Sequence, residues 1–236
     1  LMFVASMAAG VIWGVIPAIF KAYFNTNETL FTLMLNYVAM QIVTFCIVYW
    51  ENPAGSNTVG IINSATRAGW LPALGGLTYG WNVLIVLAFT FGMYIYMKYS
   101  KQGYEVAVVG ESQDTARYAR INVKRTIIRT MGISGGICGI AGFLLVSGAS
   151  HTISTSTAGG RGFTAIIVAW LSKFNAFVMI LVSFFLVFME KGAIQIASQF
   201  NLNENASDVI TGIILFFILG SEFFIRYRIA FTKAHK

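Results

Sequence analysis

The chain alternates between long uncharged apolar stretches and shorter segments in which the charged residues gather. A helix needs about 20 largely uncharged residues to cross the hydrocarbon core of a bilayer. Six stretches approach this length and are the candidate spans: 1–20, 29–50, 81–97, 130–148, 174–189 and 209–225. The pattern predicts an all-α, polytopic transmembrane helical bundle that forms a single domain over residues 1–236.

The run 162–172 is apolar but only half as long as the other stretches. At 1.5 Å per residue it is too short for a comfortable crossing. A re-entrant half-helix and a short tilted helix are both compatible with it, and the sequence leaves the choice open.

Segment 98–129 separates the third and fourth stretches and holds seven Lys and Arg residues against three Asp and Glu residues. Cytoplasmic loops carry an excess of Lys and Arg, so we expect this loop and the basic C-terminal tail to be cytoplasmic. If the loop and the tail are both cytoplasmic, the chain crosses the membrane an even number of times between them. This condition is met if 162–172 counts as one crossing. The turn-rich segment 51–80 then faces outside, as an external loop or a partly inserted hairpin.

A short helix is expected within this loop, outside the bilayer. Ser112 is a candidate N-cap, and the acidic Asp114 would lie in the first turn. Ala116, Ala119 and Val123 follow at helical spacing and would share one small apolar face. Such a face suits docking into a partner's groove, although a solvated loop that only sets topology fits the spacing equally well.

The composition excludes a soluble enzyme and a nucleic-acid module, because 57% of the residues are hydrophobic and only 11% are charged. The net charge of +7 comes from basic residues outside the apolar stretches, so we expect the lipid bilayer and not a nucleic acid as the surrounding partner. The two cysteines, Cys46 and Cys138, lie in apolar stretches and are read as packing residues.

Glycines recur four residues apart in the fourth stretch. Gly132 pairs with Gly136 and Gly135 with Gly139, which predicts a face for close helix packing. The same segment matches the G-x-S-x-G pattern of serine hydrolases around Ser134. The two histidines lie far along the chain or in the tail, so the packing interpretation is preferred.

Polar residues inside the apolar stretches are candidates for a solute pathway. They are Asn36, Gln41, Asn82 and Ser134. Intramembrane polar groups face a cavity or a neighbouring helix, and for each of these we favour a helix–helix hydrogen bond over solute contact. Glu222 and Arg226 lie four residues apart and are expected to pair. No metal-binding, cofactor-binding or P-loop motif occurs, so we expect no metal, no cofactor and no enzyme activity.

Two motifs carry a resemblance to a known family. Residues 109–123 read V-G-E-S-Q-D-T-A-R-Y-A-R-I-N-V, and 133–142 read I-S-G-G-I-C-G-I-A-G. They resemble permease subunits of bacterial ABC importers that handle simple sugars, nucleosides and branched-chain amino acids. Further similar segments are 13–17, 21–22, 27–28, 33–37, 162–163, 166–170 and 213–228, and those near the start are most similar to the nucleoside and simple-sugar branch. Ser112 and Gln113 stand where that family has Asn-Pro, and Arg120 stands where it has glycine.

The resemblance implies that 112–119 is a coupling helix seated in a cytoplasmic ATPase. The coupling residues would be Gly110, Glu111, Ser112, Asp114, Ala116, Arg117 and Ala119. The implied partners are ABC ATPase subunits, a second permease subunit, identical or different, and an external substrate-binding protein or lipoprotein. The implied location is the cytoplasmic membrane, and we expect further spans before residue 1 because family members have them. An ion-driven transporter and a non-transporting scaffold remain alternatives.

Overall fold

The computed structural model describes residues 1–236 except 52, 54, 68, 73–75, 77–78, 156, 201–208, 211, 215, 218–219 and 222–236. The chain divides into two compact units, Leu1–Gly159 and Gly160–Lys236. The described residues form helices, joined by turns and one isolated antiparallel bridge between Thr58 and Ser154. The all-α fold class is therefore confirmed.

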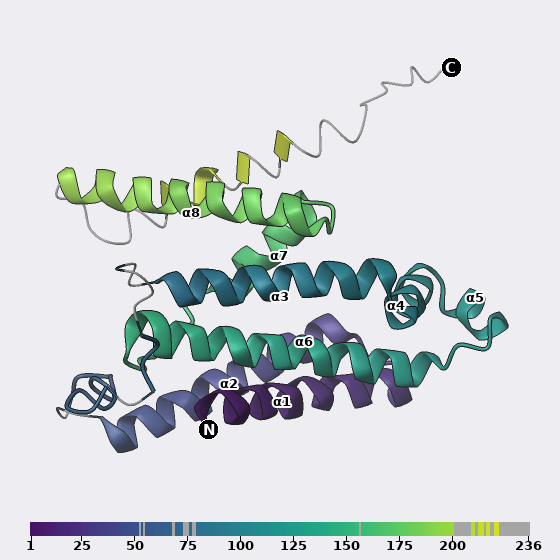
Figure 1. Ribbon diagram of the computed structural model, residues 1–236, viewed down its shortest axis with the longest axis horizontal. Helices are drawn as coiled ribbons and strands as arrows, with labels where there is room; N and C mark the ends of the chain where they lie inside the picture. Colours follow the sequence, from purple (N-terminus) through teal and green to yellow (C-terminus); the bar gives the residue numbers. More distant parts are fainter. Residues whose placement is uncertain are drawn as a thin grey trace, which may run out of the picture. The chain divides into compact units, whose positions relative to one another are not determined.

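In its described residues, the first unit contains six α-helices and one π-helical turn (Figure 1). They are α1 (Met2–Phe24), α2 (Glu28–Trp50), α3 (Gly80–Tyr99), α4 (Lys101–Glu111), α5 (Gln113–Tyr118), α6 (Val123–Leu145) and η1 (Val146–Ser150). The second unit contains α7 (Arg161–Leu171) and α8 (Ala176–Gln199). In the described part of the chain, five helical segments are long and apolar enough to cross a membrane: α1, α2, α3, α6 continued through η1, and α8.

These five segments correspond to the first five predicted spans. The sixth, 209–225, is described only in part, and Glu222 and Arg226 lie outside the described residues. Helix α7 has 11 residues and rises about 16 Å, well short of a hydrocarbon core of about 30 Å. This length favours a re-entrant or tilted segment, and the crossing parity of the C-terminal half stays a prediction.

Two membrane-spanning helices begin before the charge-free stretches predicted from the sequence, because an asparagine side chain caps each of them. Asn27 accepts the Thr29 backbone N–H at 3.1 Å and starts α2. Asn122 accepts that of Arg125 at 3.1 Å, so α6 begins at Val123 and not near residue 130. A capping side chain satisfies backbone donors that the first turn leaves free, wherever the bilayer happens to end. The first two turns of α6 therefore carry charges and extend beyond the predicted span.

Helices α1 and α6 pack antiparallel with their backbones in close contact. A Cβ atom on Gly135 or Gly139 would overlap the carbonyl oxygen of Gly10 or Ser6, and one on Gly14 would lie 2.8 Å from the Met131 oxygen. Gly10 and Gly14 form a G-x-x-x-G pair that the sequence analysis overlooked, although it is a recognised packing signal in an apolar run. The contact makes α1 and α6 one structural element.

Segment 51–79 is tied to the far end of α6. The Val59 and Ile62 N–H groups bond to the Ile153 and His151 carbonyls at 3.1 and 2.9 Å. The Trp70 ring stacks on His151 with centroids 3.9 Å apart. The turns expected for this segment are therefore confirmed in its described residues, which are attached to the residues that follow η1.

Candidate functional site

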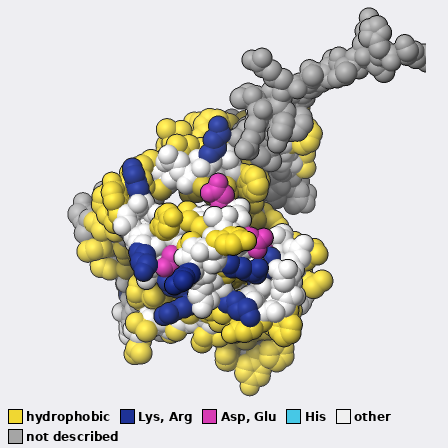
Figure 2. All heavy atoms as spheres, turned by 90° about the vertical axis from the view of Figure 1, so that its right-hand side faces the viewer, with side chains coloured by type: hydrophobic (Ala, Val, Ile, Leu, Met, Phe, Trp, Pro, Cys, Tyr) yellow, Lys and Arg dark blue, Asp and Glu magenta, His cyan; other side chains and the backbone are white. Residues whose placement is uncertain are grey.

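The end of the first unit that carries α4 and α5 is strongly basic. Figure 2 views this end and shows Lys and Arg side chains gathered on it among few acidic ones. Segment 98–129, which includes α4, α5 and the start of α6, carries Lys101, Arg117, Arg120, Lys124 and Arg125 among its basic residues. Charge of this density is compatible with water and anionic surfaces and not with the hydrocarbon core.

Helix α5 begins where the sequence predicted. The Ser112 side chain accepts the Thr115 backbone N–H at 3.2 Å, so the expected N-cap is confirmed. Asp114 and Arg117 form an ion pair at 3.2 Å along the exposed side, with 81% and 68% of their side chains accessible. An exposed pair of this kind contributes little to stability. Both charges are therefore available to a partner.

A glycine-type turn ends α5, but it is made with arginine. Arg120 has φ 57°, and its N–H bonds to the Arg117 carbonyl at 3.0 Å, while the Ile121 N–H bonds to the Ala116 carbonyl at 2.9 Å. These two bonds form a Schellman motif whose left-handed position glycine normally occupies. The departure at Arg120 therefore leaves the end of the helix intact but places a strained residue there.

Substituting Arg120→Gly should stabilise the protein by about 1 kcal/mol, because a left-handed conformation costs a side-chain-bearing residue roughly 1–2 kcal/mol. Tyr118→Gly, inside α5, should destabilise it by about the same amount. Thermal unfolding of the two variants in detergent measures the difference. If both glycine variants melt below the parent protein, the strain attributed to residue 120 is absent.

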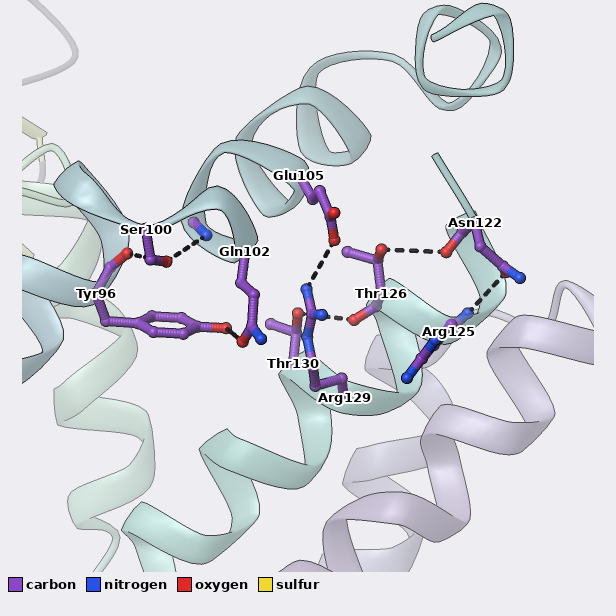
Figure 3. Close-up of polar contacts among 10 residues, drawn as sticks. Tyr96, Ser100, Gln102, Glu105, Asn122, Arg125, Thr126, Arg129 and Thr130 are labelled. Atoms are coloured by element: carbon purple, nitrogen blue, oxygen red, sulfur yellow. Dashed lines mark hydrogen bonds and ion pairs between the residues drawn. The ribbon is translucent and has the colours of Figure 1, made fainter. Parts of the chain in front are cut away.

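An ion pair connects this loop to the membrane-spanning part of the unit (Figure 3). Glu105 of α4 and Arg129 of α6 are joined Oε2 to Nη2 at 3.0 Å, and both side chains are about one-quarter exposed. Ser100 caps α4 through the Gly103 N–H at 2.9 Å, and Tyr96 of α3 donates its hydroxyl to Gln102 at 3.2 Å. Segment 98–129 is thus held to α3 and α6. The sequence analysis treated Glu105 and Arg129 only as topological charges.

The predicted docking face of Ala116, Ala119 and Val123 does not exist as one helix face. Helix α5 ends at Tyr118, and Val123 belongs to α6. Ala116 is fully buried and Val123 is 9% exposed, whereas Ala119 is exposed. The prediction was wrong because it extended helical spacing through a chain reversal at Arg120.

Tyr118 is the large apolar side chain that α5 presents outward, at 91% exposure. The sequence analysis missed it. A usable signal was present: Tyr118 falls inside the predicted loop helix 112–119, among charged residues, where an aromatic side chain is unusual unless it packs or binds. Two other candidate coupling residues, Gly110 and Glu111, are the last two residues of α4 and are exposed.

The pathway candidates are not brought together. Asn36, Gln41 and Ser134 are exposed on α2 and α6, and the Asn36 amide lies 3.9 Å from the Met40 sulfur within its own helix. Asn82, in the first turn of α3, contacts Gly148 in η1, and within the described residues its buried Oδ1 has no hydrogen-bond partner. A π-helical turn at this point is notable because such turns often accompany functional positions.

The four packing glycines of α6 all lie toward α1. Gly135 and Gly139 meet its backbone, while Cβ atoms on Gly132 and Gly136 would lie 3.4 and 3.1 Å from Val15 and Val11 side-chain atoms. In the described part of the chain, no three His, Cys, Asp or Glu side chains gather in a group suited to a metal ion.

Comparisons with known proteins agree on one family. Residues 1–219 match the family described as branched-chain amino acid transport system / permease component. The chain is 27% identical over 242 residues to the glucose ABC transporter permease protein of Haloferax volcanii, covering 97% of this chain and 63% of that protein. It is 28% identical over 224 residues to the guanosine ABC transporter permease protein of Bacillus subtilis, covering 94% and 64%.

A third relative is the nucleoside ABC transporter permease protein of Lactococcus lactis, 26% identical over 245 residues, covering all of this chain and 67% of that protein. The chain thus spans slightly less than two thirds of the length of the first two relatives. No solved structure matches it significantly.

Proposed function

The chain belongs to the family of permease components described for branched-chain amino acid transport systems, and from this premise we propose that it is the membrane-spanning subunit of an ATP-driven importer. A permease component is a transport subunit and not itself an enzyme. In this proposal the energy comes from a separate ATPase, and the solute is a nucleoside or a simple sugar, as the names of the relatives suggest.

The observation that carries the proposal is the construction of segment 98–129. Helix α5 exposes Tyr118, Asp114 and Arg117, while its inner side is buried at Ala116. A short helix with one exposed aromatic residue between charges has the composition of a protein-binding surface, since aromatic and Arg residues dominate such contacts. The proposed docking surface is therefore Glu111, Asp114, Arg117, Tyr118 and Ala119, on the cytoplasmic side.

Movement at this surface has a mechanical route into the bilayer. Helix α4 is attached to α6 through Glu105 and Arg129, and α6 is packed backbone to backbone on α1. A displacement of α5 by an ATPase would therefore shift α1 and α6 together. ATP binding drives transport only if it favours one conformation differentially, which a rigid connection of this kind permits.

The proposed partners are two ATPase subunits, a second permease subunit and an external substrate-binding protein. The described residues of the attached segment 51–79 and the η1 turn lie at the opposite end of the first unit from α5 (Figure 1) and form the proposed outer surface. Asn82 at this end is the pathway candidate best supported by position, because its buried Oδ1 has no hydrogen-bond partner among the described residues. Asn36, Gln41 and Ser134 are proposed to face neighbouring helices or subunits.

Uptake into vesicles tests the function. Vesicles that contain the full-length subunit assembled with its ATPase are supplied with the binding protein on the outside. They should accumulate radiolabelled guanosine or glucose only when ATP is present on the side of the membrane where the ATPase lies. Accumulation driven by a proton or sodium gradient without ATP would indicate a secondary transporter. If the vesicles take up no nucleoside or simple sugar, with ATP or with an ion gradient, a non-transporting scaffold is the remaining alternative.

A further inference from the structure

We propose that the first unit holds an anionic phospholipid of the cytoplasmic leaflet. Its acyl chain would lie between α1, α3 and α6, and its phosphate at the N-terminal end of α6. The observation behind it is a pair of adjoining cavities of opposite character that meet at Arg129. The proposal concerns a bound lipid and not the transported solute, and takes from the proposed function only the orientation of the chain.

The upper cavity is an open apolar groove of about 750 Å³. It is lined by apolar residues of α1, α3 and α6, and the only polar side chains among them are Tyr96 and Arg129. An unfilled groove of this size along membrane-spanning helices is open to lipid, and an apolar chain is the ligand that its walls accept without leaving a polar group unsatisfied.

The groove has the length of one leaflet. Along α6 it runs from Ile128 to Ile140, which at 1.5 Å per residue is about 18 Å. Half of a hydrocarbon core of about 30 Å is about 15 Å. An acyl chain in the groove would therefore start at the cytoplasmic interface, where Arg129 lies, and end near the middle of the bilayer.

The lower cavity, of about 460 Å³, is basic. Lys101, Arg120, Arg125 and Arg129 line it, against a single acidic residue, Glu105, which is paired with Arg129. Asn122 and the start of α6 also line it, and the first turn of a helix contributes positive partial charge. Basic pockets between membrane helices on the cytoplasmic side are suited to acidic lipid headgroups.

Arg129 lines both cavities and has a donor to offer. Its Nη2 binds Glu105, but its Nε is buried and, within the described residues, makes no hydrogen bond. A buried guanidinium donor left unsatisfied is costly. A phosphate oxygen at the junction would accept from it while the neighbouring cations neutralise the charge.

Lipid retention by the assembled transporter tests the site. Native mass spectrometry after titration with phosphatidylglycerol or phosphatidylcholine should show one tightly retained phosphatidylglycerol per chain and no comparable phosphatidylcholine. Arg125→Gln should weaken retention about fivefold, the factor for about 1 kcal/mol per basic residue at an anionic surface. Lys124→Gln is the matched control, because Lys124 neighbours Arg125 but lies over the Tyr23 ring at 4.5 Å and does not line the cavity.

The groove has its own pair of variants. Gly92 lines it, and a Cβ there meets nothing within 4 Å, so Gly92→Leu should fill the groove and abolish retention. Gly142→Leu, equally free of neighbours but outside the groove, should leave retention unchanged. Equal retention of phosphatidylcholine, equal losses in Arg125→Gln and Lys124→Gln, or displacement of the bound species by excess inorganic phosphate would each overturn the proposal.

Discussion

Replacing Gly139 with alanine should destabilise the protein by about 2–3 kcal/mol, whereas Gly142→Ala, three residues further along α6, should stabilise it by up to about 1 kcal/mol. The Cβ added at Gly139 would overlap the carbonyl oxygen of Ser6 and lie 2.9 Å from its carbonyl carbon. Both are backbone atoms and cannot rotate away, so α1 must move off α6, and overpacking of this kind costs about 1–3 kcal/mol. The gap opened at Gly10 and Gly14 adds lost dispersion contacts.

Gly142 provides a matched control because it lies on the same helix with no atom near its would-be Cβ. There the substitution brings only the intrinsic helix preference of alanine over glycine, about 0.8–1.0 kcal/mol. Unfolding titrations in mixed micelles, followed by circular dichroism, measure both variants against the parent. Equal effects at the two positions would contradict the proposed contact between the α1 and α6 backbones.

The same residues show how far the sequence predicts the fold. Charge-free stretches locate helices α1, α2, α3, α6 and α8, because charges cannot enter the hydrocarbon core at low cost. They do not locate helix ends, since Asn27 and Asn122 start helices through hydrogen bonds that are indifferent to the bilayer. The spacing of Gly135 and Gly139 predicts a packing face, but its partner is identified only once α1 is placed beside it.

The candidate site was less predictable, for a physical reason. Ser112 was recognisable as a cap because its hydrogen bond is local. The burial of Ala116 depends on a reversal at Arg120, a residue type that seldom adopts positive φ, so helical spacing was extended too far. The pairing of Glu105 with Arg129 joins residues 24 positions apart on two helices, and charge patterns along the chain do not encode such a contact.

Because the burial of Ala116 was not predictable from the sequence, Ala116 is a poor position at which to test docking of a partner, and Tyr118 is a better one. A bulky residue at Ala116 would disturb the fold of the loop, because that side chain is fully buried. Its effect on transport would therefore say nothing about a partner. Tyr118 is 91% exposed, so its removal leaves the loop's own packing unchanged.

Tyr118→Ala should lower ATP-driven uptake by at least about tenfold while the amount of folded subunit in the membrane stays the same. Exposed aromatic residues at the centre of an interface commonly contribute 2 kcal/mol or more to binding, which corresponds to an affinity loss of about 30-fold. The ATPase should therefore dissociate more readily from the variant in detergent, as measured by co-purification at decreasing ATPase concentration. Transport should recover in part when the ATPase is supplied in excess.

Tyr104→Ala is the matched control for this prediction. Tyr104 lies in the same basic loop and is 64% exposed, but it belongs to α4 and not to the proposed docking surface. The same side-chain deletion there should change neither uptake nor ATPase retention by more than about twofold. If instead Tyr104→Ala releases the ATPase and Tyr118→Ala does not, the partner binds α4, and its movement reaches Glu105 and Arg129 directly without passing through α5.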